Sequence, residues 1–556
     1  MASSPQTSLR TAAAVVVATL ALHLVLIQPN HPGAMTFGAL TLFPLELPVL
    51  ICGLLLIGAT PWAVWVRSTL VVVLLLIALL KTADVVMFTA LSRGFNPVTD
   101  MPLIESGVDL AVRTMGVLLA LATAAAAALG LGLAAGGLWW ATGVFAGLSL
   151  RVPLKPAIGA VFAAFLLTAV AQIGQVMAGW TLPLKPPGAA FTARIGAERV
   201  VMVRQTLADL KAFEAAAAQD AYAGQANLLD TIDRDLLLIF IESYGRTSFS
   251  TERYTTSHLE TLETAETRLA ELGIASRSGF LTAPTRGGQS WLIHATLSNG
   301  LWVADQASYG AVLSCSRNKL FHLAAAAGFR TAAVMPQITL EWPESDTMGF
   351  ETVLAAKDLG YAGAPFNWVT MPDQFTLSAM HRLLRQGSAD RYLFAQIALG
   401  SSHAPWMPVP ELFDWSDGGD GRIFNAMAPA GDPPKVVWQD RDRVRDQYRL
   451  AIDYALTIVI DYIARQADRP PLVIVVGDHQ PAPFVALDER DHVPMHVVGP
   501  EHLVAKSERW GLVEGLVPAP DASARPMNEL RNLILETFST EGAADSEGAT
   551  VSAGPQ

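Results

Sequence analysis

Cysteine is nearly absent from this chain of 556 residues, which contains only Cys52 and Cys315. Cys52 lies inside a long apolar run and Cys315 in the more polar distal part, so the two are not expected to meet. A disulfide framework is therefore excluded, and an exported domain here must be stabilised by its hydrophobic core. The distal part is long enough to bury such a core.

Charged residues are also scarce, at 16% of the chain against 51% hydrophobic residues. This balance excludes an ordinary soluble enzyme and indicates membrane-spanning segments. Five apolar stretches in the first third are each long enough to cross about 30 Å of hydrocarbon as helices. We therefore predict a five-helix transmembrane domain over residues 1–180, with the first helix retained because no clear cleavage site follows it. The predicted spans are residues 11–28, 38–60, 68–91, 114–147 and 156–179.

The charges that are present differ between the two parts of the chain. Residues 1–180 carry a net charge of +2 and the remainder −14. Arg10, Arg67 and the pair Arg151 and Lys155 would all flank the spans on one side, which the positive-inside rule makes the cytoplasm. Five spans then place the distal part outside the inner face of the membrane. Its acidity argues against nucleic acid as a partner.

Two charged residues, Lys81 and Asp84, lie three positions apart within the third predicted span. Residues at this spacing share a helix face, so we predict a structural ion pair near the end of the span. The alternative is a lipid headgroup contact or a relay, since charges inside a membrane often serve function.

Residues 181–230 are expected to form a juxtamembrane linker. "PLKPPG" ends the last span, and the segment that follows, from "ERVVMV", has the pattern of an amphipathic helix able to lie along the membrane.

A domain of different character follows at residues 231–538, and a disordered tail is predicted from 539 to 556. Short continuous apolar runs alternate with helical segments, which predicts an α/β domain with a mostly parallel central sheet. The predicted strands are residues 236–241, 330–335, 393–399, 472–476 and 493–498.

Polar residues gather just beyond these predicted strands. Glu242 follows the first strand and His403 the third, Asp478 and His479 follow the fourth, and His492 immediately precedes the fifth. Ligands of α/β sheets bind at the carboxyl ends of strands. Two carboxylates with imidazoles suit one divalent metal ion, Mn²⁺ or Zn²⁺.

A candidate nucleophile lies in "TAPTRGGQSWLIHATLSNG", residues 282–300. Two glycines lead to Ser290, after which a helical run begins. A hydroxyl at a helix N-terminus is well placed to attack and to hold an anion. The alternative is that Ser290 is only an N-cap.

Five motifs in order, "IESYGRTSF", "GGQSWLIHATLSNG", "SSHAPW", "GDHQP" and "HVPM", follow the predicted spans. In this arrangement the chain resembles the membrane-bound, sulfatase-like transferases of the alkaline phosphatase superfamily. That branch includes lipoteichoic acid synthase, phosphoglycerol transferase I and the phosphoethanolamine transferases. The resemblance covers nearly the whole chain and implies an alkaline-phosphatase-like catalytic domain, on the extracytoplasmic side of a bacterial inner membrane.

The resemblance also implies roles for single residues. Glu242, Asp478 and His479 would be metal ligands together with Ser290, which would be the nucleophile, and His403 would contact the substrate phosphate. Arg246, Arg286, His492 and Trp342 would bind substrate, although surface solvation of the two arginines and core packing of Trp342 are open alternatives. These residues are those of the motifs quoted above and of "TLEWPE".

One position departs from the family pattern. Gln289 stands where the family usually has its nucleophilic threonine, so the role is shifted to Ser290, with Thr285 as the substitute. If neither hydroxyl acts as the nucleophile, the protein would be inactive and would keep only the fold.

The implied reaction moves a phosphoglycerol or phosphoethanolamine headgroup from a membrane phospholipid, through a covalent intermediate on Ser290, to an envelope glycan or lipid. The alternatives are a membrane-anchored sulfatase or phosphodiesterase and an inactive membrane sensor. The sulfatase alternative is disfavoured because the chain has no Cys/Ser-X-Pro-X-Arg sequence for formylglycine formation.

Overall fold

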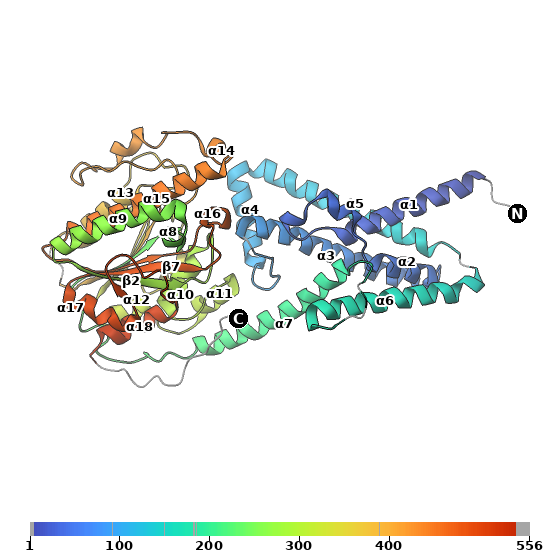
Figure 1. Cartoon of the computed structure of the whole chain (residues 1–556), viewed down its shortest axis with the longest axis horizontal. Helices are drawn as coiled ribbons and strands as arrows, with labels where there is room; N and C mark the ends of the chain where they lie inside the picture. The colour runs from blue at the N-terminus through green and yellow to red at the C-terminus, as the bar shows by residue number, and fades with distance from the viewer. Residues whose placement is uncertain are drawn as a thin grey trace. The chain divides into compact units, whose positions relative to one another are not determined.

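The structure, a computed structural model, describes residues 5–91, 93–149, 151–181, 184, 186–387 and 390–540 (Figure 1). The chain divides into two compact units, Met1–Leu210 and Lys211–Gln556. The division falls inside one long helix, α7 (Phe191–Ala217), which lies within the predicted linker at residues 181–230. Of the tail predicted from residue 539, residues 541–556 lie outside the described residues.

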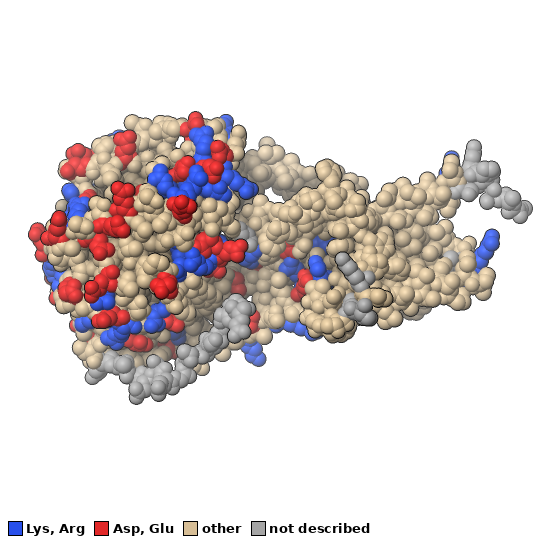
Figure 2. All heavy atoms as spheres, in the orientation of Figure 1, with Lys and Arg blue, Asp and Glu red and all other residues tan. Residues whose placement is uncertain are grey.

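The first unit is built from helices with apolar sequences. They are α1 (Pro5–Ile27), α2 (Glu46–Ile57), α3 (Ala63–Leu91), α4 (Met101–Met115), α5 (Val117–Ala146) and α6 (Lys155–Ala178). In the space-filling view this unit exposes a largely uncharged surface, whereas Lys, Arg, Asp and Glu side chains cover the second unit (Figure 2).

Within the described residues, four helices, not five, are long and apolar enough to cross a membrane. They are Leu9–Ile27, Ala63–Leu91, Val117–Ala146 and Val152–Ala178. The predicted span at 38–60 contains instead a short 3₁₀ helix, Phe37–Thr41, and the helix α2 of 12 residues. Gly58, with a φ of 59°, ends α2. The predicted count of five long spans is therefore not confirmed.

The predicted ion pair between Lys81 and Asp84 is wrong. Both side chains are buried, but Lys81 Nζ donates hydrogen bonds to the Leu26 carbonyl at 3.1 Å and to Thr192 Oγ1 at 2.9 Å. Asp84 forms an ion pair with Arg199. The two residues are three positions apart along α3, but each side chain bonds to other segments of the unit.

The second unit is centred on one sheet of nine strands in the order β4-β3-β5-β1-β6-β7-β2-β8, with β9 paired to β2. All five predicted strands are present in it. The strands are β1 (Leu236–Ile241), β2 (Ala275–Thr282), β3 (Arg330–Met335), β4 (Thr352–Ala355), β5 (Leu393–Leu399), β6 (Leu472–Gly477), β7 (His492–Gly499), β8 (Val513–Glu514) and β9 (Arg525–Pro526).

The sheet is mixed, so the predicted mostly parallel character is not confirmed. β4, β3, β5, β1 and β6 are parallel to one another, whereas β7 runs antiparallel to β6 and β2 antiparallel to β7. The antiparallel direction has a direct effect on the site: it brings the first residue of β7, His492, to the edge where β1 and β6 end. A parallel β7 would have placed His492 at the opposite edge.

Helices cover both faces of the sheet (Figure 1). Leu237, Ile239 and Ile241 of β1 pack in a core with α9 (Glu252–Glu271) and α15 (Arg441–Ala464). Leu236, Leu238 and Phe240 of the same strand pack in a second core. Because side chains alternate along a strand, the continuous apolar run of β1 fills both cores. The helices of the second core are α10 (Ser290–Asn299), α12 (Leu320–Ala326) and α18 (Glu529–Phe538).

Candidate active site

Three side chains of types that can bind a metal ion meet at the carboxyl ends of β1 and β6. Ile241 and Gly477 are register partners in these adjacent parallel strands, so Glu242 and Asp478 follow them side by side. Ligand atoms of Glu242, Asp478 and His479 all lie within 4.8 Å of one another. The sheet therefore brings together residues more than two hundred positions apart in the sequence.

The backbone fixes the orientation of two of these side chains. Asp478 Oδ1 accepts hydrogen bonds from the amides of Ser243 at 2.7 Å and His479 at 2.6 Å. His479 Nδ1 donates to the Gln480 carbonyl at 2.9 Å, which leaves Nε2 facing Glu242 Oε1 at 3.1 Å. His479 Nε2 is buried and has no hydrogen bond of good geometry within the described part of the chain. A buried imidazole nitrogen that faces two carboxylates and has no hydrogen bond of good geometry fits a divalent metal ion.

Burial and mutual charge shift the pKa values of this group strongly. Burial raises the pKa of Asp478 well above its usual range, and the negative charge of Glu242 adds to that effect. Burial alone would raise the pKa of Glu242 and lower that of His479, but their opposite charges outweigh it. The pKa of Glu242 consequently lies well below its usual range, and that of His479 is raised to about 9. Such paired shifts are typical of functional sites.

Ser290 is the first residue of α10 and joins this group. Its Oγ donates to Asp478 Oδ2 at 2.8 Å and lies 3.2 Å from Glu242 Oε2. The turn that presents it is left-handed, with a φ of 69° at Gly287 and 67° at Gln289. The hydroxyl of Thr285, the alternative nucleophile, instead donates to the Gly288 carbonyl at 3.0 Å.

The loop after β5 carries His403 next to the group. Ser402 Oγ donates to the Glu242 carbonyl at 2.6 Å, which attaches this loop to the end of β1. The charge of His403 acts on Glu242 and contributes to the lowered pKa of that carboxyl. His403 therefore lies on a loop that is attached to the end of β1 beside Glu242.

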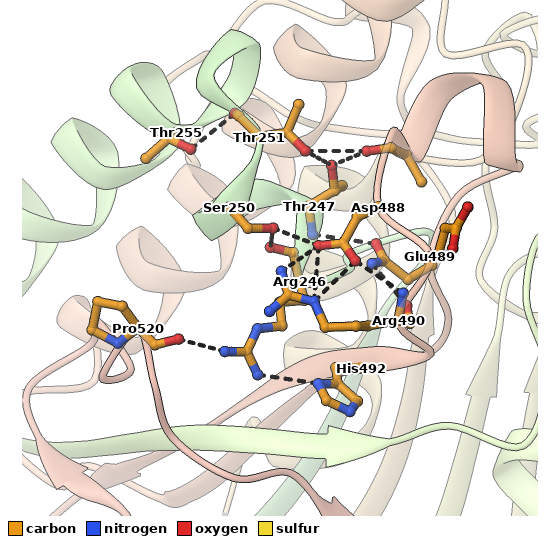
Figure 3. A network of polar contacts seen from close by, with 12 residues as sticks. Arg246, Thr247, Ser250, Thr251, Thr255, Asp488, Glu489, Arg490, His492 and Pro520 are labelled. Atoms are coloured by element: carbon orange, nitrogen blue, oxygen red, sulfur yellow. Dashed lines mark hydrogen bonds and ion pairs between the residues drawn. The ribbon is translucent and has the colours of Figure 1, made fainter.

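Arg246 and His492 contact each other and lie in a separate polar network (Figure 3). Arg246 Nη1 lies 3.1 Å from His492 Nδ1, and its guanidinium donates to the carbonyls of Pro520 and Ala522. Its guanidinium also lies 4.2 Å from the centre of the Phe280 ring. Arg246 is buried, so the alternative that it is solvated on the surface is wrong.

Arg286 and Trp342 have structural contacts of their own. Arg286 forms an ion pair with Asp491 at 2.6 Å and also donates to the Glu489 carbonyl. Trp342 is half-buried, and its ring lies 6.2 Å from that of Phe350. Within the described residues, neither side chain makes a hydrogen bond or ion pair with the group formed by Glu242, Ser290, Asp478 and His479.

Two residues near the site, His294 and the buried Asp373, were missed in the sequence. His294 lies one helical turn after Ser290, packs on the Phe240 ring at 4.3 Å, and has a pKa lowered to about 4 by burial. Asp373 Oδ1 accepts from the amides of Gly400 and Ser401 at 2.8 and 2.9 Å and so fixes the His403 loop. His294 could have been predicted, because residues four positions apart lie on the same face of a helix. The sequence around Asp373 contains no motif that indicates a role at the site.

Residues 234–514, about half of the chain, match the family described as Sulfatase. No curated protein matches the chain significantly. Among solved structures, lipoteichoic acid synthase LtaP of Listeria monocytogenes is 12% identical with a TM-score of 0.33, covering 52% of this chain and 70% of that one. Phosphoglycerol transferase GacH of Streptococcus pyogenes, in complex with sn-glycerol-1-phosphate, is 11% identical with a TM-score of 0.33, covering 59% and 90%.

Proposed function

Because the chain belongs to the sulfatase family, we propose that it is a membrane-bound, metal-dependent transferase that moves a phospholipid headgroup to an envelope acceptor. The headgroup is phosphoglycerol in preference to phosphoethanolamine, and the acceptor is a glycan or lipid of the envelope. The proposal rests mainly on the position of the Ser290 hydroxyl, which lies within hydrogen-bonding distance of both Glu242 and Asp478.

Glu242, Asp478, His479 and Ser290 would hold one ion, Mn²⁺ or Zn²⁺. When bound, it would lower the pKa of the serine hydroxyl and stabilise charge on the phosphate oxygens. Their chemistry of two carboxylates, one imidazole and one hydroxyl suits either ion, and the Nδ1 bond of His479 to the Gln480 carbonyl leaves the correct nitrogen available.

The chain's own residues can carry out the transfer in two steps. Ser290 Oγ attacks the phosphorus of the phosphodiester, and its proton passes towards the Asp478 carboxylate that already accepts its hydrogen bond. The bond from phosphorus to the diacylglycerol oxygen breaks, and His403 is the candidate donor of the proton which that oxygen takes up. An acceptor hydroxyl then attacks the phosphorus and gives its proton to His403, the bond to Ser290 breaks, and Ser290 takes back the proton held by Asp478.

The membrane unit fits this substrate, since a lipid donor then reaches the enzyme without leaving the bilayer. We propose that the protein resides in a bacterial inner membrane with its catalytic unit on the extracytoplasmic side. Arg246, Arg286, His492 and Trp342 remain candidates for binding the substrate, although Arg246 and Arg286 already have hydrogen-bond partners.

The test is to incubate the purified full chain with headgroup-labelled phosphatidylglycerol and Mn²⁺ or Zn²⁺. We expect diacylglycerol release and label on the peptide that contains Ser290, with loss of both in Ser290→Ala and after chelation. Thr285→Ala is the matched control and should retain label, because its hydroxyl points to the Gly288 carbonyl. Label that survives in Ser290→Ala would contradict the assignment. Release of free headgroup phosphate at the same rate with and without acceptor would favour the hydrolase.

A further inference from the structure

A cavity of about 310 Å³ lies at the other edge of the sheet, where the parallel strands begin. Asp235 directly precedes β1, Arg330 is the first residue of β3, and Pro471 precedes β6, and all three line the cavity. The proposed metal ligands follow the carboxyl ends of β1 and β6. A strand of six residues spans about 20 Å, so the cavity is separate from the candidate active site.

The lining of this cavity is strongly basic. It includes six arginines and only two carboxylates, those of Asp235 and Asp468. The chain beyond residue 180 has a net charge of −14, so this concentration of positive charge is opposite in sign to its surroundings. The arginines are Arg234, Arg330, Arg385, Arg391, Arg465 and Arg469.

Some of these arginines are held by the protein itself. Arg385 pairs with Asp235 at 2.8 Å and donates to Tyr462, and Arg391 pairs with Glu351 at 2.7 Å. These contacts fix the guanidinium groups in place and explain their presence without a ligand. Arg234 pairs with Asp233 at 2.8 Å and Arg465 with Asp414 at 3.9 Å, so four of the six arginines have a carboxylate partner.

Arg330 and Arg469 have no carboxylate partner in the part of the chain that the structure describes. Arg330 Nη2 donates to the Leu384 carbonyl at 2.9 Å, and its Nε lies 3.3 Å from the Arg391 carbonyl. The guanidinium of Arg469 lies 5.7 Å from the centre of the Tyr392 ring. Backbone carbonyls and an aromatic ring orient a guanidinium but do not neutralise it, so an anion in the cavity would reduce the repulsion among its neighbours.

We propose that this cavity binds a small dianionic ligand, a phosphate monoester or inorganic phosphate, at a site distinct from the candidate active site. Guanidinium groups bind phosphate oxygens through paired parallel hydrogen bonds, and several fixed ones give both affinity and orientation. The volume lies at the lower end of the range for small-molecule sites, which favours a compact ligand over a polymer.

The experiment is calorimetric titration of inorganic phosphate into the full chain in neutral detergent. The protein carries Ser290→Ala and is treated with chelator, so that the candidate active site does not contribute. The test variant adds Arg330→Gln and Arg469→Gln. The matched control adds Arg422→Gln and Arg443→Gln instead, which removes two arginines paired with Asp420 and Asp432 outside the cavity lining.

We expect the parent to bind one phosphate, the test variant to bind it at least tenfold more weakly, and the control to stay within twofold of the parent. Arg469→Gln alone, which removes no hydrogen bond found among the described residues, should weaken binding about threefold and covers the case in which the double variant fails to fold. Unchanged affinity in both test variants, or an equal loss in the control, overturns the proposal.

A second titration distinguishes a free phosphate ester from a lipid headgroup. Dihexanoyl phosphatidylglycerol below its micelle concentration presents a phosphodiester with a single negative charge. Binding at least tenfold weaker than that of phosphate supports a dianionic ester as the ligand. Equal or tighter binding of the lipid overturns that identification.

Discussion

At the scale of single residues, Arg246 and Arg286 were both predicted to bind substrate, but the two side chains differ in burial. Arg246 is buried, with hydrogen bonds to two carbonyls and a contact with His492, whereas Arg286 lies in a partly exposed ion pair with Asp491. A buried charge with fixed acceptors contributes far more to stability than a screened surface pair.

We therefore expect Arg246→Gln to lower the free energy of unfolding by about 1.5–3 kcal/mol, since it removes hydrogen bonds of a charged donor. Arg286→Gln should lower it by less than about 1 kcal/mol. Denaturant titration of the full chain in detergent, followed by tryptophan fluorescence, measures both. Equal losses in the two variants would contradict this assignment of roles.

Asp373 predicts a specific dependence on pH. Burial raises its pKa from 3.8 to about 6, despite hydrogen bonds from Gly400 and Ser401. A carboxyl whose pKa is higher in the folded than in the unfolded chain costs stability once it ionises. Its contribution is favourable below pH 4 and is lost as pH rises through about 6, by about 3 kcal/mol in total.

Asp373→Asn stays neutral, so its free energy of unfolding relative to the wild type should rise by about 3 kcal/mol between pH 4 and pH 7. Other titrating groups cancel in this difference. Asp521→Asn, which changes an exposed carboxylate, serves as the control for the loss of a surface charge. A difference that is flat with pH for Asp373→Asn would contradict the buried environment of Asp373.

At the scale of elements, the sequence predicts which runs form the sheet but not their directions. A buried strand has the same continuous apolar run whether its neighbour is parallel or antiparallel, so β7 could not be oriented from residues 493–498. β2, "ASRSGFLT", was missed because its first half is polar, and it is recruited by pairing with β7 and β8. β4, β8 and β9 are too short to give a periodic signal.

The site was predictable to the extent that it follows strand ends. Glu242, Asp478 and His479 come directly after apolar runs, and the glycines before Ser290 indicate a turn into a helix. Contacts that depend on packing between distant segments were not predictable, which is why Lys81 and Asp84 were paired with each other.

The junction between β6 and its loop gives a prediction for an element. A Cβ at Gly477 would lie 1.8 Å from the carbonyl oxygen of Tyr244, which belongs to the backbone and cannot rotate away. Gly477→Ala should therefore destabilise the protein by about 1–3 kcal/mol or more and weaken metal binding through Asp478. Binding of Mn²⁺ or Zn²⁺ and denaturant titration are the measurements.

The matched control is Gly310→Ala, within the helix α11 (Gln306–Ser314), where an added Cβ meets nothing within 4 Å. This change should stabilise the protein by about 0.5–1 kcal/mol, since alanine favours helix, and should leave metal binding unchanged. If Gly477→Ala binds metal and unfolds like the wild type, the close approach of Gly477 to the Tyr244 carbonyl would be contradicted.

At the scale of the whole molecule, the number of membrane crossings decides on which side the catalytic unit lies. Four long helices would return the chain to its starting side, whereas an extracytoplasmic catalytic unit with a cytoplasmic N-terminus requires a fifth crossing. The 12 residues of α2 span only about 18 Å as a helix, so the segments beside α2 must complete that crossing.

We expect Asp417→Cys, in a background lacking Cys52 and Cys315, to react with a membrane-impermeant maleimide in intact spheroplasts. Arg151→Cys should react only after permeabilisation, because the positive-inside rule places it in the cytoplasm. Both residues are exposed, so accessibility within the protein does not limit labelling. Labelling of Asp417→Cys only after permeabilisation would place the catalytic unit in the cytoplasm.

The long separation in sequence between the residues of the candidate site affects the order of events during synthesis. Glu242 and Ser290 leave the ribosome well before Asp478 and His479, which are delivered only when β6 completes its pairing with β1. On the proposed function, a nascent chain would carry the nucleophile but lack half of the ligands that make it reactive. Its serine would stay inert towards surrounding lipids until β6 has been translated and has paired with β1.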